Sequence, residues 1–136
     1  MIKLTDEFAR YQIDISFLKG FTDNLEKAQQ LLCENEYVRL LLPINFYYTI
    51  KSGDESFEGG TSNGRAVFTN KRFLHISENK LFDALYDDIE IRTYELYTQD
   101  LLLEITSEKF ELKYENDFKT VDTLMKRIME ISGKDF

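Results

Sequence analysis

The fold is decided by Gly64-Arg65-Ala66-Val67-Phe68-Thr69-Asn70-Lys71-Arg72-Phe73-Leu74-His75-Ile76, in which two short apolar runs flank a polar segment. The apolar runs are 65–68 and 73–77, and the polar segment is 69–72. Thr and Asn side chains hydrogen-bond nearby backbone groups and therefore favour turns. The stretch predicts a β-hairpin whose turn spans 69–72.

Outside this hairpin, apolar and polar residues alternate as they do in strands with one buried face. The alternation predicts strands at 44–50, 89–93, 101–105 and 110–114. Segment 51–64 is rich in Ser, Gly and acidic residues and contains Asn63-Gly64, a pair typical of tight turns. It predicts a loop or a long hairpin connection within a meander of antiparallel strands.

Two segments show the period of amphipathic helices. The first follows Asp23, an N-cap residue, and ends near residue 34, whereas the second begins at Asn116 or Asp117 and ends at Gly133. The apolar stripe of the second helix consists of Phe118, Val121, Leu124, Met125, Ile128 and Met129. We expect residues 1–19 to form an N-terminal extension, with at most a short helix, and residues 20–136 to form one domain.

This order of elements predicts an α+β fold. We expect a curled antiparallel β-barrel of about seven short strands, with an N-terminal helix and a C-terminal helix that caps its open corner. That arrangement is the pleckstrin-homology architecture. The alternative is a different α+β fold, such as a helix-on-sheet cone.

The stretch 64–76 also resembles the central hairpin of the bacterial pleckstrin-homology-like domains, in particular the YokE-like group. The likeness follows the element order over residues 20–133, with a looser match at Leu85-Tyr86-Asp87-Asp88-Ile89. The resemblance implies the same fold and a binding or assembly role. It implies no shared catalytic residues and no agreed ligand.

Charge narrows the classes of partner. The chain has 136 residues with 25 acidic and 17 basic side chains, a net charge of −8. Such a field repels phosphate backbones and anionic lipid surfaces, so we do not expect nucleic acid or a membrane surface as partner. The longest apolar run, 40–44, is too short to span a bilayer. A single cysteine and a start that lacks a leader sequence indicate a cytoplasmic protein.

The sequence offers little for catalysis. His75 is the only histidine, and it shares a strand face with Phe73, which predicts partial burial and a structural role. Cys33 lies beside Glu34 and Glu36, whose charges disfavour a reactive thiolate. Because no nucleophile, base and orienting residue can be assembled, we expect no enzyme and no cofactor or metal site.

Basic side chains are concentrated at Lys71 and Arg72, with Arg65 across the hairpin and Lys80 nearby. Arg65, Lys71 and Arg72 are a candidate contact for an anion or an acidic partner. The alternative is structural: the Thr69 hydroxyl and the Asn70 amide bond the turn backbone while Lys71 and Arg72 stay in water.

Tyrosines on solvent-facing positions suggest a second contact surface. Alternation places Tyr47, Tyr94 and Tyr97 on solvent faces or strand edges, and surface Tyr is common in protein interfaces. We therefore expect a non-catalytic protein–protein binding or assembly module that binds another protein or itself as a homo-oligomer. The alternative is a small acidic inhibitor or immunity-type protein that blocks a basic or nucleic-acid-handling partner.

Overall fold

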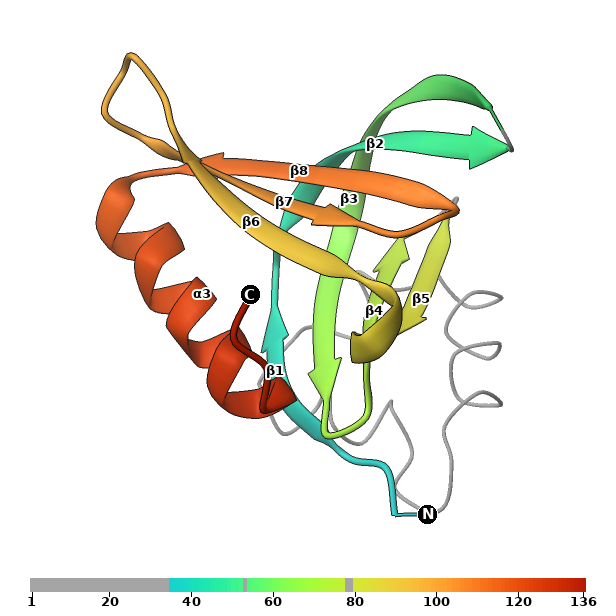
Figure 1. Ribbon diagram of the computed structural model, residues 1–136, viewed down its shortest axis with the longest axis vertical. Helices are drawn as coiled ribbons and strands as arrows, with labels where there is room; N and C mark the ends of the chain where they lie inside the picture. The colour runs from blue at the N-terminus through green and yellow to red at the C-terminus, as the bar shows by residue number, and fades with distance from the viewer. Residues whose placement is uncertain (1–34, 53, 78–79) are drawn as a thin grey trace.

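The structure is a computed structural model that describes residues 35–52, 54–77 and 80–136 (Figure 1). The predicted extension 1–19 and the predicted helix that follows Asp23 lie outside the described residues. In chain order the elements are β1 (Val38–Leu42), β2 (Asn45–Ser52), β3 (Glu55–Thr69), β4 (Arg72–Ser77), β5 (Leu81–Leu85), the 3-10 helix η2 (Tyr86–Asp88), β6 (Glu90–Glu95), β7 (Leu101–Thr106), β8 (Phe110–Asn116) and α3 (Phe118–Ser132).

The strands form one antiparallel path in the order β5-β4-β3-β2-β8-β7-β6, and β1 pairs with β3 off this path. Over the described part of the chain, no pairing joins the edge strands β5 and β6. The expected barrel is therefore not closed, although the antiparallel sheets and the C-terminal helix are confirmed (Figure 1). Charged residues on the edge strands, such as Asp83 and Glu90, disfavour pairing between them.

Of the two alternatives predicted for 51–64, a loop or a long hairpin connection, the loop is wrong, because the segment belongs to the long hairpin of β2 and β3. Strand β3 is 15 residues long, and its first half pairs with β2 while its second half pairs with β1 and β4. Gly60, with φ +93, lies at a bulge opposite Tyr48, and a side chain at Gly64 would collide with the carbonyl of Ile76. Gly60 thus permits a bulge and Gly64 permits two strands to approach closely, whereas the sequence had suggested that the glycines form turns.

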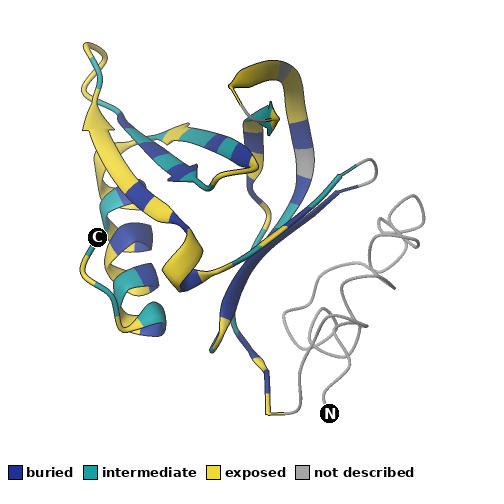
Figure 2. Ribbon diagram, turned by 45° about the vertical axis from the view of Figure 1, so that its right-hand side comes forward, coloured by how far each residue is buried: buried dark blue, intermediate teal, exposed yellow. Residues whose placement is uncertain are grey.

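The hairpin at 69–72 is confirmed, because β3 ends at Thr69 and β4 begins at Arg72. The alternation predicted for 101–105 is also confirmed, since Leu101, Leu103 and Ile105 are buried. Both halves of the curled sheet point large apolar side chains into one core, and Figure 2 shows this burial along β3, β4 and the inner side of α3. Members without any exposed surface include Phe46, Phe68, Phe73, Leu103, Leu112 and Ile128.

Helix α3 begins and ends as the sequence predicts. The Asp117 carboxylate accepts a hydrogen bond from the Thr120 backbone N–H at 2.7 Å, and Gly133, with φ 70, closes the C-terminus. The helix packs on β7, β3 and β8. Phe118, the first residue of α3, is 53% exposed and does not join the predicted stripe, and burial along the helix begins at Val121. No helix within the described residues is long and apolar enough to cross a membrane.

Candidate functional site

An apolar groove of about 830 Å³ lies between β1, the start of β2 and α3. We call it the β1–α3 groove. Its floor is formed by Leu40, Leu42, Ile44 and Leu124. Leu40 and Leu42 lie opposite Phe68 and Ala66 in the register, so their side chains point to the core side, where they remain only half-buried.

The groove exists because the chain changes neighbours at Pro43. β2 pairs on both sides, with β3 and with β8, whereas β1 pairs with β3 alone among the described strands. At the junction, the Ile44 N–H donates to the Leu42 carbonyl at 3.0 Å, a tight turn around Pro43. β8 leads directly into α3, which therefore faces the second edge of β1 across the groove (Figure 1).

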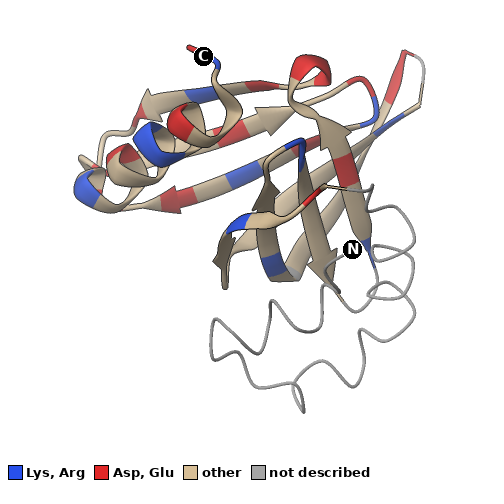
Figure 3. Ribbon diagram, turned by 90° about the horizontal axis from the view of Figure 1, so that it is seen from below, with Lys and Arg blue, Asp and Glu red and all other residues tan. Residues whose placement is uncertain are grey.

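The α3 side of the groove is basic. Lys119, Lys126 and Arg127 line it with one carboxylate, Glu130, whereas the chain as a whole carries −8. Figure 3 shows basic and acidic segments interspersed along this helix. Arg127 contacts Glu130 at 3.4 Å, and Lys126 contacts Asp122 at 2.9 Å, but such exposed pairs are weak. Lys119 takes part in no ion pair within the described residues.

The three predicted basic residues Arg65, Lys71 and Arg72 do not form one cluster in the structure. Arg72 is buried, with its Nε 2.9 Å from Glu36 Oε2 and its Nη1 3.8 Å from Asp83 Oδ2. Lys71 is exposed, and Arg65 is half-buried and donates to the Gly64 carbonyl at 3.0 Å. Because Arg65 lies opposite Ile76, at the far end of β4 from Arg72, the three cations do not converge on one point.

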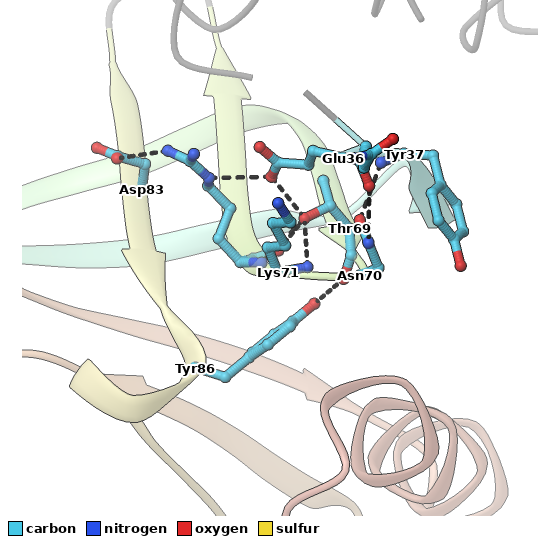
Figure 4. A network of polar contacts seen from close by, with 9 residues as sticks. Glu36, Tyr37, Thr69, Asn70, Lys71, Asp83 and Tyr86 are labelled. Atoms are coloured by element: carbon cyan, nitrogen blue, oxygen red, sulfur yellow. Dashed lines mark hydrogen bonds and ion pairs between the residues drawn. The ribbon is translucent and has the colours of Figure 1, made fainter. Parts of the chain in front are cut away.

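The turn itself is held by the polar network of Figure 4. The Thr69 hydroxyl accepts the N–H groups of Lys71 and Arg72 at 3.0 and 2.9 Å and donates to Glu36 at 2.7 Å. The role predicted for Thr69 is therefore confirmed. The Tyr86 hydroxyl donates to the Thr69 carbonyl at 2.6 Å, and burial together with the Glu36 charge raises the pKa of Tyr86.

Two other details of that structural interpretation are wrong. Asn70 bonds a different segment: its side chain accepts the Tyr37 N–H at 2.9 Å and donates to the Asn35 carbonyl at 3.0 Å. Arg72 does not stay in water, because Glu36 meets it inside the protein. Sequence spacing could not predict either contact, since residues 35–37 reach the hairpin only through the pairing of β1 with β3.

His75 is fully buried, whereas the sequence predicted partial burial, and its side chain packs in the core. Its Nε2 donates to the Ile44 carbonyl at 3.0 Å, its Nδ1 lies 3.4 Å from the Ser62 hydroxyl, and its ring centroid lies 4.9 Å from that of Phe46. Burial lowers the pKa of His75 to about 4. No group of three or more metal-ligating side chains occurs among the described residues.

The three predicted tyrosines are exposed but do not form one cluster. Tyr47 lies on β2, Tyr94 lies three strands away on β6, and Tyr97 is in the turn between β6 and β7. Tyr94 pairs directly with Leu102, as a local contact surface would require, and Lys113 lies beside Tyr47. The tyrosines thus mark separate points on the outward side of β2-β8-β7-β6.

An acidic hollow of about 430 Å³ lies at the open seam, between β5–η2 and the turn that joins β7 to β8. Asp83, Asp87, Asp88 and Glu108 line it together with Lys109. The hollow shares no lining residue with the β1–α3 groove, and two of its carboxylates are paired, Asp87 with Lys134 at 2.6 Å and Asp83 with Arg72 at 3.8 Å.

Sequence reasoning missed the β1–α3 groove. Its signal lies in the apolar run 40–44 and in the basic positions of α3, which contrast with the acidic charge of the whole chain. No protein-family model matches the chain, and comparison with the curated proteins finds no match.

Proposed function

We propose that this chain is a non-catalytic protein-binding module on a pleckstrin-homology-like fold, and that the β1–α3 groove is its binding site. The fold part of the proposal is supported by the seven-strand path that curls around one core and by the C-terminal helix packed on it. Both features are what the resemblance of stretch 64–76 implies. β1 is an addition to that path.

The binding part rests on one observation, the open apolar groove with a basic wall in an otherwise acidic protein. Exposed apolar hollows rimmed by polar residues mark interaction sites. Because cations of α3 line the groove, the partner should carry negative charge, in the form of carboxylates beside its apolar residues.

A pull-down from the cells of origin tests the proposal with two matched variants. Thr123→Trp fills the groove from α3, and Thr98→Trp places the same bulk on the exposed turn between β6 and β7. We expect Thr98→Trp to retain a stoichiometric partner and Thr123→Trp to lose it. Equal recovery by both variants would contradict binding in the groove.

The acidic hollow supports a second candidate, the small inhibitor that binds a basic partner. In that case affinity is mainly electrostatic, so the partner should leave when salt rises from about 0.1 to 0.5 M. The double variant Asp88→Asn with Glu108→Gln removes two charges from the acidic hollow, and it should release the partner at low salt as well. A partner that survives both treatments would exclude the inhibitor.

A further inference from the structure

We propose that the β1–α3 groove takes its partner as an extended strand that pairs with the edge of β1 to which no described strand is paired. The segment carries apolar side chains at alternate positions and at least one carboxylate for the wall of α3. This inference rests on the proposed function and specifies the form of the partner.

The first step concerns the edge. Successive backbone groups of a regular strand point to opposite sides, and β1 is regular over Leu40–Leu42, after a register shift between Val38 and Leu40, so part of this stretch directs its N–H and C=O away from β3. Of the described strands, none pairs with that side of β1. An unpaired edge is a template for an added strand. Pro43 has no N–H and ends the ladder, and the register shift between Val38 and Leu40 interrupts it at the other end, so the paired segment would match the regular stretch Leu40–Leu42.

The second step concerns the side chains. A strand added beside β1 has neighbours of Leu40 and Leu42 pointing to the same face, which is the floor of the groove. There they meet Leu124 and the Thr123 side of α3. Side chains between them point to the other face and escape this contact. The groove therefore selects apolar residues with a period of two.

The third step excludes other occupants. A bound helix satisfies its own backbone and would leave the edge of β1 unpaired, whereas a strand uses the edge and the floor together. A second copy that docked edge to edge would bring Lys119, Lys126 and Arg127 of both chains together, and like charges repel. A segment with carboxylates meets the same side chains favourably.

The test is a selection of displayed random peptides of about twelve residues on the full chain, followed by affinity measurement with the enriched peptides. We expect enriched peptides to alternate apolar residues and to carry acidic ones. Lys119→Glu should weaken them about fivefold. Thr123→Trp should abolish their binding, while Thr98→Trp should leave it unchanged.

N-methylation of the best peptide, one position at a time, reports its conformation, because it removes one backbone donor at each step. Loss at every second position supports the added strand. If N-methylation lowers affinity without a period of two, and the Thr123→Trp variant still fails to bind the peptide, the added strand is contradicted but the groove remains a binding site. Peptides that bind Thr123→Trp as well as wild type, or no enrichment at all, overturn both the inference and the proposed function.

Discussion

At the scale of single residues, the most constrained contact is a buried ion pair between Glu36 and Arg72. Glu36 is fully buried, and its contacts include an ion pair with the guanidinium of Arg72 and a hydrogen bond from the hydroxyl of Thr69. A buried ion pair contributes little net stability. Removal of one partner nevertheless destabilises the protein strongly, because it leaves an uncompensated charge in the protein interior. The pair therefore specifies how residues 35–37 join the hairpin more than it stabilises the fold.

We expect Glu36→Ala to lower the free energy of unfolding by about 3 kcal/mol, because Arg72 keeps its charge and loses a carboxylate at 2.9 Å. Glu36→Leu with Arg72→Met should cost less than the sum of the single changes. Urea unfolding followed by circular dichroism measures all of these. The control is Arg92→Ala, which breaks an exposed pair and should cost under about 0.5 kcal/mol. Strict additivity of the two buried changes would contradict the coupling.

His75 gives the protein a dependence on pH. Its pKa is about 4 in the folded state, against about 6.5 in an unfolded chain, so the unfolded state binds more protons between these values. Stability is therefore lost as pH falls through this window. Between pH 7 and pH 5, where most carboxylates stay ionised, we expect a loss of about 2 kcal/mol from this group. His75→Phe should flatten that part of the curve, and an equal slope in both proteins would contradict it.

At the scale of elements, β3 is the strand on which both halves depend. Its pairing with β4 requires the close approach at Gly64, where an added methyl group would meet the Ile76 carbonyl. Gly133 also resists substitution, but for a different reason: its φ of 70 strains other residues although the surrounding space is open.

The two glycines therefore make a matched pair of tests. We expect Gly64→Ala to cost about 3 kcal/mol, because strand backbones must separate to admit the side chain. Gly133→Ala should cost about 1 kcal/mol, the backbone strain alone. Denaturant midpoints of the two variants decide the order, and a milder effect at Gly64 would show that β3 and β4 can shift apart easily.

The same elements show what local sequence can predict. The turn at 69–72 and the ends of α3 depend on residues close in sequence, Thr69, Asp117 and Gly133, and both predictions are confirmed. For 51–64 the sequence left a loop and a long hairpin connection open, because Gly and Asn occur in turns and in bulges alike, and the pairing with β2 decides for the hairpin. The groove escapes sequence reasoning because it needs β1 and α3 together, and no local pattern reports that contact.

At the scale of the whole molecule, the described strands form a curled sheet that does not close, and α3 packs on its inner face and completes the core. Val121 and Ile128 have no exposed surface, and they pack in the same cluster as side chains from both halves of the sheet. Charge is divided as well, with a basic α3 and an acidic seam.

A chain that stops before Asn116 should therefore lose its cooperative thermal transition, because both halves of the sheet would expose their inner faces. Circular dichroism during heating measures this, with a chain that stops after Gly133 as control. A cooperative melt of the shorter chain would contradict the role of α3 and favour the helix-on-sheet alternative.

The length of β3 has a mechanical consequence. This strand borders β1 and β4 at one end and β2 at the other, so it is shared by ladders on both sides of the core. A pull along β1 acts parallel to its antiparallel ladder with β3, and such a load breaks several hydrogen bonds at once instead of one after another. Tension from a tethered partner would thus be distributed along a continuous backbone into two halves of the molecule, the loading geometry of a shear joint.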